Sequence, residues 1–386
     1  MTDFLPFALP EIGDDEIAEV VDSLRSGWVT TGPKAKRFET DFISFLGDRS
    51  LEAISVNSAT SGLHLALEAL GVSEGDEVIV PTYTFTATAE IVRYLGATPV
   101  MVDVDAHTFN MTVDTFSKAI TDKTKVVVPV HFSGLSCDMN PIIRLAKENG
   151  IKIVEDAAHA LPAMYQGEMI GTLDTDFTVF SFYANKTMTT GEGGMVVSRN
   201  KELSKRCRIM RLHGISKDAF DRYTSTKPSW FYEVVAPGYK YNMPDISAAM
   251  GIHQLKRLPG FLSKRSEMAK IYHDELKDLS FELPSLAPKG DQHAWHLYPI
   301  KLKPESGISR DVFIEKMAEL GIGCSVHFIP LHLHPYWRDT YKLTSDMFPI
   351  AQRLFEQEVS LPLYTKMTLD DQKRVISAVK KVLGNA

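Results

Sequence analysis

The alternation of short Val- and Ile-rich runs with helix-like stretches constrains the fold of this chain more than any other feature of its sequence. Five runs in the first two-thirds of the chain have the length and near-continuous apolar character of buried strands. Segments 61–70 and 140–149 are typical of helices, and a glycine follows each of them. Strands of this kind that alternate with helices predict an α/β fold, in which helices cover both faces of a mainly parallel sheet. The expected strands are 76–81, 99–103, 125–129, 151–156 and 177–182.

The pattern changes in the last third of the chain. Loops that contain Pro and Gly precede a strand expected at 294–302. Ser309 is placed to cap the next helix, and Thr368 is placed to cap a last amphipathic helix.

This change predicts two domains, because single hydrophobic cores rarely exceed roughly 250–300 residues. We expect a large α/β domain over residues 1–258 and a smaller α+β domain over residues 259–386. The segment 217–238, rich in polar and aromatic residues, is expected to form a long loop, and such loops often have a function.

Composition and charge exclude several classes of function. The formal net charge of -7 disfavours binding to a nucleic-acid backbone, which requires clustered Lys and Arg. The three cysteines, Cys137, Cys207 and Cys324, form no CxxC pair, and this usage suits a reducing compartment. The first residues are acidic and contain prolines, unlike a signal peptide, and no apolar run approaches the ~20 residues that span a bilayer. We therefore expect a cytoplasmic protein without a nucleic-acid partner and without membrane insertion.

Ligands bind sheets of this kind at the carboxyl ends of the strands, so the residues that follow each strand are candidate site residues. The first candidate is the segment 57–62, which lies between a short strand and a helix and consists mostly of small residues. Free N–H groups at the start of a helix favour a phosphate there. The alternative is that Thr60 simply caps the helix.

A carboxylate ends the expected strand 151–156. Burying Asp156 without a partner would cost free energy, so its carboxylate must have one. A protonated ring nitrogen of a bound cofactor would suit it, and Ala158 is small enough to lie under a flat ring. The alternative is that Asp156 caps a following helix.

Lys186 follows the strand 177–182 and precedes a glycine-rich turn that ends at Gly194. A lysine held inside a site has a lowered pKa, and its amine can then attack a carbonyl. Ser181 offers a hydroxyl to a phosphate, and Phe85, which follows an earlier strand, can stack on a ring. The alternatives are a solvated lysine and an aromatic side chain in the core. The segment is not a dinucleotide-binding fingerprint, because the glycine spacing differs and a strand follows it.

The order of these signals along the chain is specific. A phosphate loop, a stacking aromatic, a strand-end Asp, a Ser and then a Lys form the layout of a pyridoxal-phosphate (PLP) enzyme on an α/β scaffold. The motif from Glu155 to His159 and the segments 181–194 and 238–245 carry a further likeness. Through them, and over nearly all of its length, the chain resembles the DegT family of PLP-dependent sugar aminotransferases of fold type I.

The resemblance implies a role for each of these residues. Lys186 would bind PLP covalently and move a proton between the substrate carbon and the cofactor. Asp156 would keep the pyridine nitrogen protonated, and His159 would assist beside it. In family members an Asn that matches Asn242 reaches the phosphate in the partner subunit, which implies a homodimer with shared active sites. The other implied cofactor contacts are Phe85 and Ala158 on the ring faces, and Ala59, Thr60 and Ser181 at the phosphate.

The resemblance also suggests the substrate class. Within the family, the chain is most similar to the aminotransferases that form UDP-4-amino-4-deoxy-L-arabinose, so the amino donor would be L-glutamate, giving 2-oxoglutarate. The leading acceptor is C4 of a UDP-linked 4-keto-pentose. Tyr183 stands where those enzymes carry His, and it favours the alternative, a UDP-, dTDP- or GDP-linked 4-keto-6-deoxyhexose of surface polysaccharide or glycan biosynthesis. The implied substrate-binding residues are Trp28, Thr30, Tyr183, Lys240 and His327.

Three other functions stay open. A PLP-dependent sugar 3-dehydratase shares the scaffold, but such enzymes carry His in place of Lys186. A metalloenzyme would use histidines of the C-terminal half such as His293 and His296, but no HExxH motif is present, and we expect no metal. A PLP-binding regulator without catalysis would not need both Lys186 and Asp156.

Overall fold

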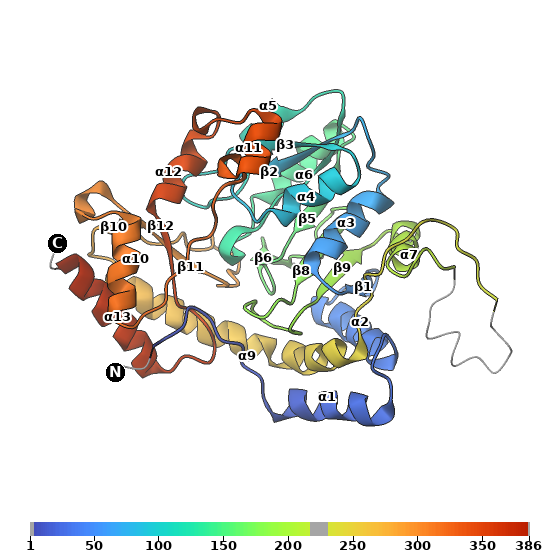
Figure 1. Ribbon diagram of the computed structural model, residues 1–386, viewed down its shortest axis with the longest axis horizontal. Coiled ribbons are helices and arrows are strands. Elements are labelled where there is room, and N and C mark those ends of the chain that lie inside the picture. The colour runs from blue at the N-terminus through green and yellow to red at the C-terminus, as the bar shows by residue number, and fades with distance from the viewer. Residues whose placement is uncertain (1–3, 217–230, 385–386) are drawn as a thin grey trace.

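A seven-stranded sheet forms the centre of the structure, a computed structural model that describes residues 4–216 and 231–384 (Figure 1). The strand order is β1-β9-β8-β5-β4-β2-β3. β9 runs antiparallel to both of its neighbours, and the other pairs are parallel. The strands of this sheet are β1 (Glu52–Val56), β2 (Glu77–Pro81), β3 (Thr98–Val102), β4 (Thr124–Val127), β5 (Lys152–Asp156), β8 (Phe177–Ser181) and β9 (Gly194–Ser198).

The expected α/β architecture is confirmed. Each of the five expected strands is present, with ends within two residues of the expected ones. The helices expected at 61–70 and 140–149 are also present, as α3 and α6. The helices are α1 (Asp14–Ser26), α2 (Pro33–Leu46), α3 (Ala59–Ala69), α4 (Ala87–Tyr94), α5 (Val113–Ala119), α6 (Met139–Glu148), α7 (Lys201–Met210), α9 (Asp245–Leu276), α10 (Arg310–Glu319), α11 (Pro335–Tyr341), α12 (Pro349–Gln357) and α13 (Leu369–Gly384).

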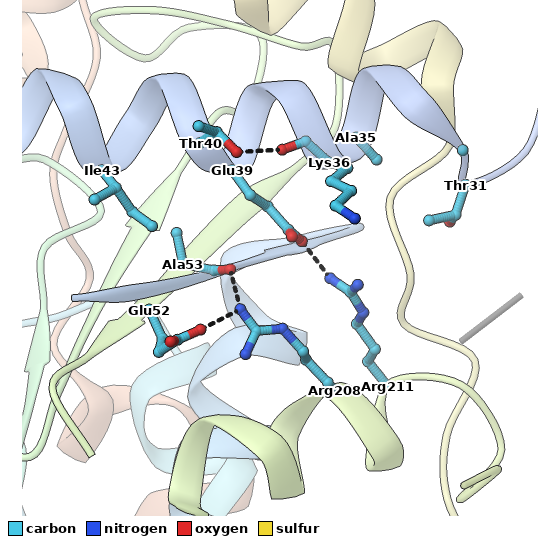
Figure 2. A pocket seen from close by; sticks show the side chains of 11 residues that line it. Thr31, Ala35, Lys36, Glu39, Thr40, Ile43, Glu52, Ala53, Arg208 and Arg211 are labelled. Atoms are coloured by element: carbon cyan, nitrogen blue, oxygen red, sulfur yellow. Dashed lines mark hydrogen bonds and ion pairs between the residues drawn. The ribbon is translucent and has the colours of Figure 1, made fainter. Parts of the chain in front are cut away.

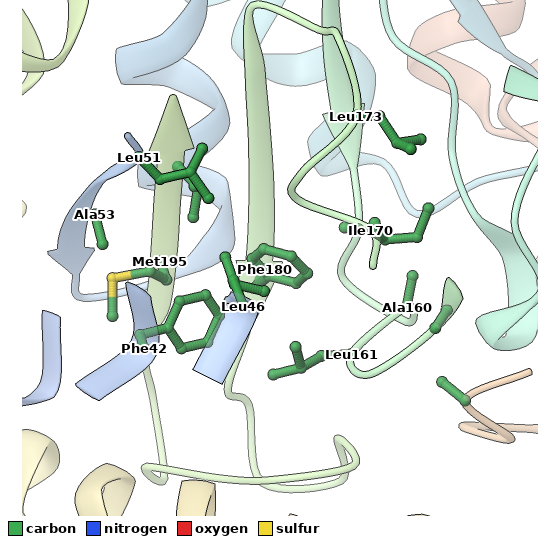
Figure 3. Packing of buried hydrophobic residues seen from close by; sticks show 14 of the residues in the cluster. Phe42, Leu46, Leu51, Ala53, Ala160, Leu161, Ile170, Leu173, Phe180 and Met195 are labelled. Atoms are coloured by element: carbon green, nitrogen blue, oxygen red, sulfur yellow. The ribbon is translucent and has the colours of Figure 1, made fainter. Parts of the chain in front are cut away.

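Helices cover both faces of the central sheet. Side chains alternate between the two faces along each strand, so both faces present apolar residues to the helices. Ile79 and Ile153 face one cluster of buried apolar residues, to which α2, α5, α6 and α9 contribute. In this cluster Phe42 of α2 packs edge-on against Phe180 of β8 (Figure 3). Val78 and Val154 face the opposite cluster, to which α3, α4, α7, α11 and α12 contribute.

The C-terminal part adds a three-stranded antiparallel sheet in the order β10 (Phe281–Glu282), β11 (Tyr298–Leu302) and β12 (Glu358–Leu361). It packs with α10, α13 and the second half of α9 around its own apolar cluster. Helix α9 crosses residue 258 without a break, so the expected domain boundary falls inside a helix (Figure 1). The division into two domains therefore stays a prediction. A further two-stranded ribbon joins β6 (Met164–Tyr165) and β7 (Glu168–Met169).

Three local expectations in this part of the chain can be compared with the structure. Ser309 and Thr368 accept hydrogen bonds from backbone N–H groups three residues later, which confirms both as helix caps. The prediction of a strand at 294–302 is wrong for its first four residues. Trp295 has a positive φ of 51°, which breaks an extended run, and only Tyr298–Leu302 forms a strand.

Among the residues that the structure describes, no helix combines the length and apolar character needed to cross a bilayer.

Candidate active site

A cavity of about 510 Å³ opens at the carboxyl ends of the parallel strands. The segments that follow β1, β2, β5 and β8 form most of its wall, and two C-terminal segments complete it. Because parallel strands end at one edge, residues far apart in the sequence meet there. The lining residues are Ser58, Ala59, Thr60, Leu63, Thr84, Phe85, Ala87, Thr88, Val130, Asp156, Ala158, His159, Ser181, Tyr183, Asn185, Lys186, Glu192, Gly193, His296, His327 and Phe328.

Lys186 enters this cavity from a turn that follows β8. The turn closes through a hydrogen bond from the Lys186 N–H to the carbonyl oxygen of Tyr183. The Lys186 Nζ lies 3.5 Å from Nε2 of His296, and both side chains line the cavity. Burial lowers the pKa of Lys186 to about 8, although the nearby Asp156 opposes the shift. A lysine with this pKa has a substantial neutral fraction near pH 8 and can act as a nucleophile.

Asp156 ends β5 with its carboxylate buried in the cavity wall. One carboxylate oxygen accepts a hydrogen bond from the hydroxyl of Thr88 at 2.9 Å, and the other accepts from the N–H of Ala158 at 3.2 Å. Burial raises the pKa of this carboxyl group. No helix begins directly after β5, so the alternative that Asp156 caps a helix is wrong. A buried carboxylate in a cavity wall suits a cationic group of a ligand.

The start of α3 lies at the cavity, where the segment 57–62 predicts a phosphate site. The hydroxyl of Ser58 accepts a hydrogen bond from the N–H of Ser61, so Ser58 caps the helix and the alternative role of Thr60 as the cap is wrong. Ala59 and Thr60 are the first residues of the helix and line the cavity together with Ser181. A helix start attracts an anion through its unpaired N–H groups and its dipole.

A glycine allows this helix start to lie close to the sheet. A Cβ atom on Gly194, the first residue of β9, would lie 2.8 Å from the Ala59 nitrogen and 2.8 Å from the Phe180 carbonyl oxygen. Such distances are too short for any side chain, so the glycine-rich turn after Lys186 has a packing function.

Three imidazoles, those of His159, His296 and His327, line the cavity. His159 accepts a hydrogen bond from the N–H of Ser133 through Nδ1, and its ring lies 4.4 Å from the ring of His296. Burial lowers the pKa of His159 and His296 well below the ordinary histidine value, and lowers that of His327 to about 3. All three rings are therefore neutral near pH 7, and they leave Lys186 as the titrating base of the cavity.

Apolar rings form the remaining wall. The ring of Phe85 is 59% exposed and lies 6.0 Å from the ring of Phe328, which also stacks near His159. Ala158 lines the same cavity, as the resemblance implies. Tyr183 stands at the opening with 48% of its surface exposed. An exposed aromatic at a cavity mouth is suited to stacking on a bound ring.

Four predicted residues lie outside the cavity lining of this chain: Trp28, Thr30, Lys240 and Asn242. Two of them form hydrogen bonds with residues of other segments. Asn242 donates a hydrogen bond to Thr31 at 2.6 Å, and the Lys240 carbonyl oxygen accepts one from Asn57 at 3.3 Å. Most of the expected loop 217–238 lies outside the described residues. The roles of these four residues stay predictions.

The structure adds cavity residues that the sequence did not indicate. Thr88 belongs to the segment that contains Phe85, but its bond to Asp156 depends on the fold, which brings the start of α4 to the end of β5. The sequence offers His296 as a metal ligand, whereas its Nε2 lies 3.5 Å from the Nζ of Lys186. Within residues 4–216 and 231–384, no group of three His, Cys, Asp or Glu side chains is arranged to hold a metal ion.

A second cavity, of about 310 Å³, lies between α2, β1 and the end of α7 (Figure 2). Its arginines are paired with its carboxylates. Arg211 contacts Glu39 at 2.6 Å, and Arg208 contacts Glu52 at 2.8 Å. The lysine of this cavity, Lys36, is exposed, whereas burial lowers the pKa of Lys186 in the larger cavity. The larger cavity is therefore the candidate active site.

Comparison with known proteins agrees with this geometry. Residues 10–380 match the DegT/DnrJ/EryC1/StrS aminotransferase family. The chain belongs to this family. It is 44% identical to the spore coat polysaccharide biosynthesis protein SpsC of Bacillus subtilis, over 99% of this chain and 98% of SpsC.

Solved structures of family members share the whole fold. Spr1654 of Streptococcus pneumoniae in its PMP-form superposes with a TM-score of 0.92 at 36% identity, and the match covers 99% of each chain. A PLP-form of the same protein matches with a TM-score of 0.91. PseC of Helicobacter pylori, an aminotransferase involved in the biosynthesis of pseudoaminic acid, matches with a TM-score of 0.90 at 28% identity over 100% of both chains.

PLP is the cofactor of this DegT-family protein, and the cavity residues fit it. The buried carboxylate of Asp156 would pair with a protonated ring nitrogen, and the start of α3, which lines the same cavity, would receive the phosphate. Lys186 provides an amine of lowered pKa. When bound, PLP supplies a ring that withdraws electrons from the substrate carbon. The chain is therefore a PLP-dependent transaminase of the sugar aminotransferase family.

Proposed function

We propose that this protein transfers the amino group of L-glutamate to C4 of a nucleotide-linked 4-keto sugar. One observation carries the proposal: a single cavity combines Lys186, Asp156 and the start of α3. The same cavity is also lined by the exposed Tyr183. Relatives that act in polysaccharide and in pseudoaminic acid biosynthesis support a sugar as the amino acceptor.

Each half-reaction needs a proton to move at the substrate carbon, and the cavity has one group suited to move it. Lys186 titrates near pH 8, so it can both accept and return a proton. Asp156 would hold positive charge on the ring nitrogen throughout. His159, neutral and held by the N–H of Ser133, would keep its place beside the ring without adding charge.

The leading candidate acceptor is UDP-4-keto-pentose, and it rests on the likeness of Trp28, Thr30, Lys240 and His327 to the arabinose-forming enzymes. Lys240 is exposed, so it can meet a diphosphate as a point charge. A 4-keto-6-deoxyhexose is the second candidate. Tyr183 and Asn185 favour it, because they change the shape of the wall beside Lys186. The cytoplasmic location expected from the cysteines belongs to the same proposal.

An assay with a panel of acceptors tests the proposal. We expect glutamate-dependent amination of UDP-4-keto-pentose, and a Lys186→Ala variant should be inactive on every substrate. The panel also contains UDP-4-keto-6-deoxy-N-acetylhexosamine and dTDP-4-keto-6-deoxyglucose, and kcat/KM is compared for all three. An additional methyl group separates substrates by only ~10–200-fold, so a clear preference for a hexose would exclude the pentose and leave C4 amination standing. Amination of 3-keto sugars alone would contradict the proposal.

A further inference from the structure

His327 is connected to a buried carboxylate that lies outside the cavity. Its Nδ1 lies 2.9 Å from the hydroxyl oxygen of Ser360, and that hydroxyl lies 2.5 Å from Oε1 of Glu358. The second oxygen of Glu358 accepts a hydrogen bond from the backbone N–H of His327 at 2.9 Å. Glu358 and Ser360 are both on β12 and fully buried. The three residues form a closed chain of hydrogen bonds.

The direction of these hydrogen bonds, meaning which atom donates and which accepts, depends on the charge of Glu358. A carboxylate only accepts, so Ser360 must donate to it, and Nδ1 of His327 must then carry a proton and donate to Ser360. A protonated Glu358 donates to Ser360 from Oε1, because Oε2 is occupied by a backbone N–H. Ser360 then donates to Nδ1, and the ring proton moves to Nε2.

The Nε2 atom is the ring nitrogen left for a ligand. His327 lines the cavity, and within the described part of the chain no residue forms a hydrogen bond with its Nε2. The ring remains neutral, because burial and then the charge of Lys186 lower the pKa of His327 to about 3. We propose that the ionisation state of Glu358, transmitted through Ser360, determines whether His327 offers the substrate a hydrogen-bond acceptor or a donor. Glu358 and Ser360 are thus positioning residues.

Among the charged and titratable groups that surround it, Glu358 is the one that changes its charge near neutral pH. The positive charge of Arg310 in α10 favours the carboxylate form of Glu358. Tyr83 and Cys324 stay neutral, because burial raises the pKa of both groups, that of Cys324 to about 12. Lys301, the neighbour of Glu358 across the β11–β12 pair, is bound to Glu282 at 2.6 Å. Burial raises the pKa of Glu358 itself to about 8.

The consequence for catalysis depends on the proposed function. Above the pKa of Glu358, the lone pair of Nε2 would accept a hydrogen bond from a hydroxyl or amino group of the sugar. Below that pKa, the Nε2–H would donate to a carbonyl or ring oxygen. The same side chain would then favour different sugar groups on the two sides of about pH 8.

Nitrogen NMR of the holoenzyme with ¹⁵N-labelled histidine tests the proposal without any substrate, and a His327→Asn variant assigns the signals. We expect the proton of His327 on Nδ1 at high pH and on Nε2 at low pH, with a midpoint near 8. In Glu358→Gln the amide must donate to Ser360, so the proton should stay on Nε2 from about pH 6 to about pH 10. Glu356→Gln, an exposed change two residues away, should behave as wild type.

A wild-type tautomer that stays constant over this range would overturn the proposal, as would a Glu358→Gln variant that follows the wild-type titration. Ser360→Ala provides a second variant, in which the dependence on pH should disappear. If the proposed function also holds, Glu358→Gln should lower kcat/KM for the keto sugar on the order of 10- to 100-fold above pH 8, since one buried polar contact is lost. The NMR result does not depend on that assay, so the failure of either proposal can be recognised separately.

Discussion

The chemistry of the cavity depends on the balance between one ammonium and one carboxylate. Burial moves the pKa of Lys186 down and that of Asp156 up, so each group is pushed toward its neutral form. Each also stabilises the charged form of the other. A protonated ring nitrogen would take over as the partner of Asp156 once Lys186 has reacted. The two residues therefore prepare the cavity for a cofactor that carries its own positive charge.

The lowered pKa of Lys186 predicts how the cofactor-free protein captures PLP. Only the neutral amine reacts, and with a pKa of about 8 its fraction is about 10% at pH 7 and nearly complete above pH 9. The capture rate, followed by absorbance after mixing with PLP, should rise with pH and level off above a midpoint near 8. Borohydride should then fix the cofactor to a peptide that contains Lys186. A midpoint near the ordinary lysine value, or labelling of another lysine, would contradict the assignment.

Asp156→Asn is the matched variant for this measurement. Removing the negative charge removes the effect that raises the pKa of Lys186, so the capture midpoint should move to lower pH. Transamination should fall by orders of magnitude, because the protonated ring nitrogen loses its partner. The fold should persist, and circular dichroism checks it. Near-normal turnover would show that Asp156 has only a structural role.

At the scale of secondary structure, the site depends on how closely α3 approaches the sheet. Gly194 of β9 and Gly62 of α3 both lie where a Cβ atom would meet a neighbour at 2.8 Å. At Gly62 the neighbour is a side-chain methyl of Val179, whereas at Gly194 the neighbours are backbone atoms, which cannot move aside. The position of the start of α3, where a phosphate would bind, therefore depends on a residue of β9.

Gly194→Ala should therefore displace the start of α3. We expect a loss of about 1–3 kcal/mol in the free energy of unfolding, as for other overpacked sites, together with weaker PLP binding. Gly260→Ala is the matched control, because a Cβ atom there meets nothing within 4 Å and the residue is in helix α9. That change should stabilise the protein by roughly 0.5–1 kcal/mol and leave PLP binding unchanged. Urea unfolding and PLP titration measure both effects, and equal behaviour of the two variants would contradict this account of Gly194.

For the whole molecule, the cavity of one chain lacks positive charge for its proposed substrates. Among the described residues that line it, Lys186 is the only Lys or Arg, and the covalent bond to PLP would use its amine. A nucleotide diphosphate and glutamate both carry negative charge. Asn242 and Lys240 lie outside the lining, beside Asn57. A homodimer in which these residues serve the partner cavity would supply the missing contacts, and we propose that assembly.

Mixed dimers test the shared site. Chains with Lys186→Ala and chains with Asn242→Ala should each be inactive or nearly so. In a hybrid, one of the two cavities regains both residues, so an equal mixture of the chains should recover about a quarter of wild-type activity. Native mass spectrometry confirms that hybrids form. Absence of recovery in confirmed hybrids would exclude a shared site built on Asn242.

The sequence by itself was sufficient for the five central strands, the mainly parallel sheet and the PLP cofactor, and it predicted that Lys186 and Asp156 lie at one site, as the cavity lining shows. These conclusions depend on local signals: apolar runs of strand length, glycines that end helices, and a strand-end carboxylate followed thirty residues later by a lysine. The side chains that face a cavity at the ends of parallel strands follow from topology, which such local signals predict.

Tertiary structure alone decided which residues complete the cavity. Thr88 reaches Asp156 across 68 positions of the chain, and His296 reaches Lys186 across 110. Ser58 rather than Thr60 caps α3, and Ser360 connects His327 to Glu358. A residue's local sequence sets its backbone preference, but a contact between distant segments exists only when helices and strands pack at one particular spacing. For that reason the location of Lys186 at the ends of the strands could be predicted from the sequence, whereas the hydrogen bonds that connect His327 to Ser360 and Glu358 required the fold.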